Sequence, residues 1–309
     1  PDAQALKLLD AAGAGGLDAA GPREAAGRLI ALGPGAARVL LSRLTPERFD
    51  DSLWIRLALA AWGHAAADAV LMAREDARPQ VRAWRAGALG VTTLRAARML
   101  EKSMSDPDWR SRRAGALALG TLLSRETGEE PGRLRVLAEA EAVARGGRST
   151  ATLENIGARR LGDLLGALSL DAYADPADVM AVYAAAPDPF GRFGPDSPPV
   201  QAFLGVLAAR PAYAEALHAE LDSASAAAPR VRMALRALLK DKEPEVVHAA
   251  LTALAQLGDT SDAARVAAFL KDGRALLREA AAAGLGRMGS SGRDAVAAAL
   301  SARTSRERS

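Results

Sequence analysis

Side chains that commonly carry out catalysis or bind metals are few in this sequence and widely spaced. The chain of 309 residues has no cysteine and three histidines, His64, His218 and His248. Thiolate zinc sites, disulfide bonds and cysteine nucleophiles are therefore excluded. No His-Glu-x-x-His or His-x-x-x-His spacing places two histidines on one helix face to hold a metal ion. We expect the three histidines to be surface or groove residues.

Short motifs that bind phosphates or activate a serine are also missing. The glycine-rich stretch 13–16 lacks the Lys-Ser/Thr of a phosphate-binding loop, and no strand is predicted before it, so we interpret it as a connection between helices. No Gly-x-Ser-x-Gly turn, which exposes a serine nucleophile, is present. The sequence therefore predicts no catalytic residue, no metal ion and no cofactor.

One charged pattern recurs, an aspartate followed six residues later by an arginine. We call its members the Asp–Arg ladder: Asp50 and Arg56, Asp76 and Arg82, Asp106 and Arg112, Asp272 and Arg278. An aspartate in the turn before a helix accepts hydrogen bonds from the first free N–H groups. The arginine then lies on that helix, within reach of an aspartate in its own or an adjacent turn. Two interpretations are open, a charged groove and a device that fixes the stacking of repeated units, and the recurrence favours stacking.

The elements that carry these residues are predicted to be helices. Apolar residues make up 50% of the chain and aromatic residues only 4%. Ala, Leu, Arg and Glu favour helices, whereas strands favour β-branched and aromatic residues. The 40 basic and 37 acidic side chains give a net charge of +3, which is weak support for nucleic-acid binding. No stretch approaches the roughly 20 apolar residues of a membrane-spanning helix.

Apolar helical segments end in glycine at regular intervals. Gly33, Gly63, Gly90 and Gly120 lie 30, 27 and 30 residues apart, and Gly258 and Gly289 lie 31 apart. Glycine commonly ends a helix, because it tolerates the left-handed conformation. The predicted helix pairs are 2–12 with 21–32, 34–44 with 50–62, 64–74 with 78–89, 92–104 with 107–123, 131–146 with 150–168, 175–186 with 198–209, a pair at 211–224, 229–240 with 243–257, and 261–271 with 273–288, followed by a last helix at 291–302.

Two segments resemble the second helix of HEAT repeats. They are residues 76–90, Asp-Ala-Arg-Pro-Gln-Val-Arg-Ala-Trp-Arg-Ala-Gly-Ala-Leu-Gly, and residues 243–258, Glu-Pro-Glu-Val-Val-His-Ala-Ala-Leu-Thr-Ala-Leu-Ala-Gln-Leu-Gly. That family has an Asp-Pro turn followed by Val-Arg-x-x-Ala-x-x-Ala-Leu-Gly, and residues 34–124 and 229–302 match it. The resemblance implies an all-α, right-handed α-α superhelix (a HEAT-like solenoid) of about eight or nine helix pairs, with the second helices on the concave side. Because Val247 or His248 stands at the arginine position of residues 243–258, we expect an interruption of the ladder there.

A single continuous array is expected, with a loop inside it. Residues 1–186 would form N-terminal repeats, and residues 200–309 C-terminal repeats with a capping helix. Residues 187–199 are too rich in Pro and Gly to be helical. Because stacked repeats share one core, these parts are not separate domains. Gly120 and Gly258 are 138 residues apart, between four and five units, so the middle is predicted to be irregular.

The first candidate binding site is a basic patch. It consists of Arg82, Arg85, Trp109 and Arg113, with Trp84 on the same predicted helix as Arg82 and with Arg159 and Arg160 on a later one. A row of arginines beside exposed tryptophan holds phosphates and stacks bases. In the alternative interpretation, the tryptophans pack between repeats and the arginines pair with acidic residues.

The second candidate is the loop at 187–199. Long loops without regular structure are often functional, and Phe190 and Phe193 with Arg192 between them would anchor a partner. In the alternative interpretation, both rings fold back over the irregular middle of the array and seal it.

The predicted function is that of a non-catalytic scaffold or adaptor that binds another protein in the concave groove, since extended, pre-formed surfaces suit large, shallow contacts. One alternative is nucleic-acid binding, with base chemistry as in HEAT-like DNA glycosylases. Another is an accessory or regulatory subunit, as in lyase-like members of the wider family. The Ala-, Arg- and Gly-rich composition suggests a bacterial source. Pro1 indicates a removed leader or a trimmed terminus. Because no membrane-spanning stretch is predicted, a soluble protein is expected, either cytoplasmic or exported.

Overall fold

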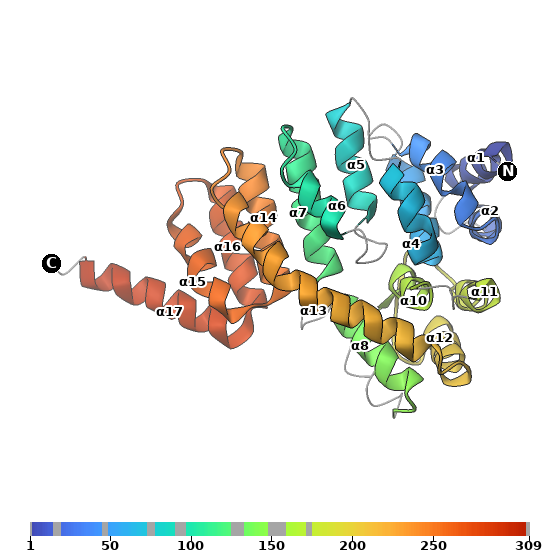
Figure 1. The fold of residues 1–309 in the computed structure, drawn as a ribbon. Helices are drawn as coiled ribbons and strands as arrows, with labels where there is room; N and C mark the ends of the chain where they lie inside the picture. The colour runs from blue at the N-terminus through green and yellow to red at the C-terminus, as the bar shows by residue number, and fades with distance from the viewer. Residues whose placement is uncertain are drawn as a thin grey trace.

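The computed structural model of this protein is almost entirely helical (Figure 1). It describes residues 2–14, 20–44, 49–72, 78–89, 97–124, 133–147, 159–170 and 175–306. The predicted all-α class is confirmed for these ranges. Within them, the one departure is an antiparallel pair of two-residue strands, β1 (Arg159–Arg160) and β2 (Arg192–Phe193), and β2 belongs to the Pro/Gly-rich loop.

The helices of the first half follow one another at short intervals. They are α1 (Asp2–Gly13), α2 (Ala20–Ala31), α3 (Ala37–Arg43), α4 (Phe49–Met72), α5 (Pro79–Leu89), α6 (Ala97–Ser103) and α7 (Trp109–Leu122), with a 3-10 turn at Pro34–Ala36. The later helices are α8 (Arg133–Ala144), α10 (Leu161–Leu168), α11 (Pro176–Ala185), α12 (Pro198–Ala209), α13 (Tyr213–Leu238), α14 (Pro244–Leu257), α15 (Ala263–Ala268), α16 (Ala275–Arg287) and α17 (Gly289–Arg306), with 3-10 turns at Thr260–Asp262 and Phe269–Lys271.

Aspartate and proline mark several helix starts. Proline occupies the first position of α5, α11 and α14, where its missing N–H removes no helical hydrogen bond. The carboxylates of Asp108 and Asp175 accept the N–H groups of Arg110 and Ala177, both at 2.9 Å, and so cap α7 and α11.

One predicted helix boundary is wrong, and another lies at a kink. The segments expected at 211–224 and 229–240 form one helix, α13, which continues through Pro229. Pro229 is exposed, so the carbonyl group that loses its helical partner lies on the side open to water, while buried Val231 and Leu235 hold the next turns in place. The predicted stop at Gly63 is found: the backbone of α4 leaves helical geometry there, at φ +46° and ψ −119°, and a second helical segment follows it.

The order of helices in space differs from their order in the chain. Helix α7 packs between α5 and α14, and α14 in turn packs between α7 and α16. We call α5, α7, α14 and α16 the helix row. Gly120, predicted to end a helix, lies inside α7 and lets α14 approach closely: a Cβ atom there would lie 2.9 Å from Cα and Cβ of Ala253.

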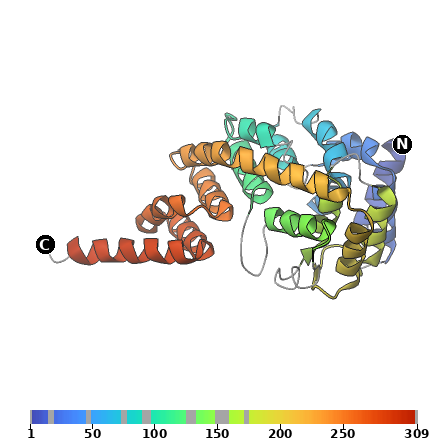
Figure 2. The same cartoon turned by 60° about the horizontal axis from the view of Figure 1, so that its bottom comes forward.

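The residues between α7 and α13 do not extend the row. They fold back, so that α10 packs on α4, α11 packs on α2, and α8 packs along α13 (Figures 1 and 2). Tyr183 Oη of α11 donates to the carbonyl of Arg23 at 2.7 Å, and Arg23 donates to the carbonyl of Ala184 at 2.8 Å. At the kink of α4, the N–H of His64 donates to the carbonyl of Ser169 at 2.9 Å. The long helix α13 then returns the chain to the row.

Buried side chains form two clusters that meet at α14. The larger cluster extends from α1 to α14 and includes Val246 and Leu254. The smaller one contains Val247 and Leu251 of α14 with residues of α15, α16 and α17. Helix α14 is therefore shared between the two cores, one on each side of it.

Candidate functional site: the helix row and its terminal pocket

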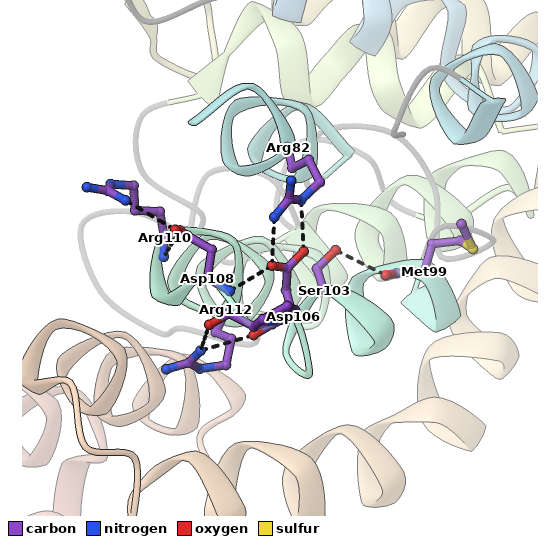
Figure 3. Close-up of polar contacts among 8 residues, drawn as sticks. Arg82, Met99, Ser103, Asp106, Asp108, Arg110 and Arg112 are labelled. Carbon is purple, nitrogen blue, oxygen red and sulfur yellow. Dashed lines mark hydrogen bonds and ion pairs between the residues drawn. The ribbon is translucent and has the colours of Figure 1, made fainter. Parts of the chain in front are cut away.

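A paired Asp–Arg contact links α5 to the turn before α7 (Figure 3). Arg82 Nε and Nη2 donate to Asp106 Oδ2 and Oδ1, both at 3.0 Å. The same carboxylate accepts the N–H of Asp108 at 2.9 Å and so shapes the turn. An arginine of one helix is thus held by the turn that begins the next helix of the row.

The next contact of this kind crosses 129 residues of sequence. Arg112 Nε and Nη2 of α7 donate to Asp241 Oδ2 and Oδ1 at 2.8 and 3.0 Å. Arg112 Nη1 also donates to the carbonyls of Asp106 and Pro107, at 3.0 and 2.9 Å. Asp241 accepts the N–H of Glu243 at 3.0 Å, as Asp106 does for Asp108. The turn before α14 therefore holds an arginine of α7, just as the turn before α7 holds an arginine of α5.

Arg112 and Asp241 form a close ion pair that is nearly buried. The side chains of Arg112 and Asp241 are 12% and 9% exposed. Partial burial acts to raise the pKa of Asp241, but the hydrogen bonds from Arg112 and from the Glu243 N–H outweigh it, so the pKa is lowered. The bond to Asp241 correspondingly raises the pKa of Arg112. Both groups remain ionised at neutral pH.

Sequence reasoning missed Asp241. The residue six positions later is Val247, not arginine, so the two-residue motif could not find it. The feature that recurs is a single aspartate three residues before the first residue of a row helix, with or without the later arginine. Val247 is 1% exposed and packs in the smaller core. An apolar contact thus replaces the arginine at this position of the ladder.

In the last turn of the ladder, the aspartate pairs with an arginine of the same turn. Asp272 Oδ1 and Oδ2 accept from Arg274 Nε and Nη2, each at 2.9 Å, and these bonds lower the pKa of Asp272 to about 2. Arg278 Nη1 donates to the carbonyls of Asp272 and Gly273 at 2.8 and 2.9 Å, in the same way as Arg112 in its own turn. At the other end, Asp76 and the side chain of Asp50 lie outside the described residues. Burial lowers the pKa of Arg56.

The predicted basic patch is not gathered on one exposed surface. Arg82 is held by Asp106, and Arg85 is buried, with 8% of its surface exposed. Trp109 is partly buried against the larger core, with the guanidinium of Arg110 5.0 Å from its ring centre. Arg113 alone of the four predicted patch residues is exposed. The side chains of Trp84, Arg159 and Arg160 lie outside the described part of the structure.

The two rings of the predicted phenylalanine anchor pack toward the interior. Phe193 is 5% exposed and belongs to the larger core. Phe190 packs edge-on against the buried Trp54 of α4, with ring centres 4.6 Å apart. Arg192 between them is exposed. Both rings fold back over the middle of the molecule, because burying them stabilises the loop more than leaving them in water.

The three histidines lie apart. His218 of α13 contacts Glu141 at 2.8 Å and Asp222 at 3.4 Å, and His64 begins the second part of α4. His248 of α14 is half-buried, and burial, with smaller contributions from Arg113 and Arg287, lowers its pKa. Among the described residues, no group of three His, Asp or Glu side chains is arranged to hold a metal ion. None of the described helices is long and apolar enough to cross a membrane.

One side of the helix row is open to solvent. On each row helix, the residues seven and eleven positions after the turn aspartate lie one helical turn apart and share that side. These residues, which we call the row face, are Ala83, Gly87, Arg113, Leu117, His248, Thr252, Glu279 and Ala283. All eight are half-buried or exposed. The row face thus spans four neighbouring helices and combines four small residues with Arg113, Leu117, His248 and Glu279.

A pocket of about 620 Å³ lies at the C-terminal ends of α7, α14 and α16. Leu123, Leu134 and Leu257 form its floor, and Arg232, Asp259 and Arg287 are its charged residues; we call it the terminal pocket. Arg232 Nη1 lies 2.6 Å from Asp259 Oδ2. No motif pointed to this pocket, because its walls come from five separate helices and the turn at Asp259 and Thr260.

Comparison of the chain with models of known protein families gives no match, and comparison with curated protein sequences gives none either.

Proposed function

We propose that this protein is a non-catalytic scaffold that binds a partner protein on the row face, and that its helix pairs form a HEAT-like α-α superhelix around that face. The observation that carries the proposal is the continuity of the row: α5, α7, α14 and α16 pack in sequence and expose equivalent positions on one side. Stacked helix pairs create extended surfaces, and such surfaces suit the large contact areas of protein partners.

The charge distribution supports a protein partner over a nucleic acid. Of the basic residues expected to contact phosphates, Arg82 is neutralised by Asp106 and Arg85 is buried. The row face carries Arg113 and His248 but also Glu279, so its formal charge is close to zero with His248 neutral. Binding of a phosphate backbone requires several uncompensated cations along one surface.

Substitutions on the row face test the proposal. We expect Thr252→Arg combined with Ala283→Arg to weaken partner binding at least tenfold, because two long cations would stand on the open face and block close approach. The matched control is Ser223→Arg, at an exposed position of α13 away from the row face. The measurement is affinity capture from extracts of the source organism with all three proteins, followed by determination of Kd for the purified partner.

Two results would contradict the proposal. One is retention of the same proteins, with equal affinity, by the wild type, the double variant and Ser223→Arg. The other is tight binding of duplex or single-stranded DNA that weakens steeply with added salt and is lost in Arg113→Glu, which would establish the nucleic-acid alternative.

A further inference from the structure

Successive row helices meet through the same positions. Six residues after its turn aspartate, a row helix can carry an arginine that pairs with the turn aspartate of the next row helix. Arg82 of α5 pairs with Asp106 in this way, and Arg112 of α7 pairs with Asp241. The side of a row helix that carries this position therefore faces the following helix of the row.

Close packing follows the same spacing near the other end of each helix. Gly120, fourteen residues after the turn aspartate of α7, lies against Ala253, twelve residues after that of α14. Ala255 and Gly284 repeat this spacing between α14 and α16, where a Cβ atom at Gly284 would lie 3.2 Å from Cβ of Ala255. Each pair joins one glycine to one alanine. Both positions thus need small residues, because the two helices approach closely there.

Helix α16 leaves the equivalent positions open to solvent. Arg278, Ala282 and Gly286 stand six, ten and fourteen residues after its turn aspartate and share one side of the helix; we call them the end face. All three are exposed, and no atom lies within 4 Å of a Cβ built at Gly286. Ala116, the residue of α7 equivalent to Ala282, is completely buried. Helix α17 packs on α15 and α16 but extends away from them toward the C-terminus, and it leaves the end face uncovered (Figures 1 and 2).

The guanidinium group of Arg278 is positioned like that of Arg112. Arg278 Nη1 donates to the carbonyls of Asp272 and Gly273, as Arg112 Nη1 does to two carbonyls of its own turn. Arg112 donates from Nε and Nη2 to the carboxylate of Asp241, whereas Nε and Nη2 of Arg278 donate to no residue that the structure describes. Two parallel donors match the two oxygens of one carboxylate. Arg278 is therefore fixed through one nitrogen and offers the other two.

We propose that the end face docks a helix of a partner protein, which joins the helix row after α16. This helix follows a turn with an aspartate, whose carboxylate pairs with Nε and Nη2 of Arg278. It carries glycine or alanine twelve residues after that aspartate, against Gly286. The chemistry of the occupant comes from the contact between α7 and α14, because the end face repeats the α7 side of that contact. The end face is separate from the row face, so this inference goes beyond the proposed function and does not depend on it.

The occupant is a different protein and not a second copy of this chain. Three row turns have aspartate side chains that the structure describes, and each is already paired within the chain: Asp106 with Arg82, Asp241 with Arg112, and Asp272 with Arg274. A second copy would have to break one of these pairs before that carboxylate could bind Arg278.

The test tethers a copy of residues 241–258, the turn and helix of α14, to the C-terminus of the full-length protein. A flexible Gly/Ser linker of about 20 residues joins them. Tethering raises the effective concentration of the copy into the millimolar range, so that even weak docking is detected. Because so short a segment forms little helix by itself in water, docking is expected to add the circular-dichroism signal of a 14-residue helix.

Variants of α16 show where the copy docks. The added signal should be lost in Gly286→Leu, which places a large side chain where close approach is needed. In Arg278→Ala, the docked copy should melt at a lower temperature, because its carboxylate has lost both donors. Ala283→Leu is the matched control, since it adds a side chain of the same size at an exposed position of the same helix, on the row face. The added signal should persist there.

A copy that gains no helix on the wild-type chain, or that gains as much on Gly286→Leu, would overturn the proposal. Sedimentation velocity of the chain without the copy is the second measurement, and a monomer is expected at micromolar concentration. A dimer that Gly286→Leu abolishes would make a second copy the occupant and would also contradict the proposal. The scaffold proposal is judged separately, because Thr252→Arg and Ala283→Arg change the row face and leave the three end-face residues in place.

Discussion

Replacing Asp241 with asparagine is expected to lower the free energy of unfolding by about 3 kcal/mol at pH 7. The amide of asparagine still accepts the N–H of Glu243, but Arg112, 12% exposed, loses its opposite charge. Breaking a nearly buried ion pair is costly because the remaining charge stays out of water without a counter-charge. The measurement is urea unfolding followed by circular dichroism, comparing Asp241→Asn with the wild type.

The matched control is Arg274→Ala in the last turn of the ladder. Arg274 also pairs with a turn aspartate, Asp272, but its side chain is 46% exposed and the contact stays within one turn. Exposed ion pairs contribute little to stability, because water and salt screen them, so little change is expected. Because the pKa of Asp241 is lowered, its contribution is present above the ordinary aspartate pKa and is lost as pH falls through the folded value. Equal effects of the two substitutions at pH 7 would show that Arg112 and Asp241 do not join the two halves of the row.

Substitution of Gly120 by alanine is expected to destabilise the protein by about 2 kcal/mol. In a helix, glycine to alanine usually stabilises by about 0.5 to 1 kcal/mol. Here the added Cβ atom would meet the side-chain oxygen of Gln256 and would lie 2.9 Å from Cα and Cβ of Ala253, so α7 and α14 would have to move apart. Thermal unfolding of Gly120→Ala and the wild type measures the difference.

Gly286 provides a control at the equivalent position. It lies fourteen residues after Asp272, as Gly120 lies fourteen after Asp106, but no atom lies within 4 Å of a Cβ built there. Gly286→Ala is therefore expected to stabilise by about 0.5 to 1 kcal/mol. If both substitutions stabilise, α14 does not pack closely against α7 at Gly120.

Local sequence signals predicted much of the helical structure. The helix expected at 243–257 is found at Pro244–Leu257, and the one expected at 273–288 is found at Ala275–Arg287. The first begins with a proline and the second follows a turn aspartate, and both have an apolar repeat of period close to four. The glycine signal was less reliable, because Gly258 ends its helix at φ +65° whereas Gly120 serves close helix packing. The same residue type thus marks two different structural needs.

The arrangement of the row could not be predicted from local patterns. Nothing near Arg112 indicates that its partner is Asp241, 129 positions later, because helices α8, α10, α11 and α12 pack elsewhere before α13 returns the chain to the row. A helix boundary was expected between residues 224 and 229, yet α13 continues through Pro229, because the packing of the helix on both sides outweighs the local cost. The terminal pocket depends on that return of α13, so its residues, Arg232 and Arg287 among them, could be brought together only by the fold.

The central claim is that α14 follows α7 directly in the helix row. Because the chain has no cysteine, a pair of introduced cysteines can test it cleanly. Arg113→Cys and His248→Cys occupy equivalent positions on the neighbouring helices, and both side chains are open to solvent in part. A short bismaleimide is predicted to join this pair rapidly in the folded protein and to leave Arg113→Cys with Arg145→Cys unjoined. Rapid joining of the second pair, with no joining of the first, would contradict the account.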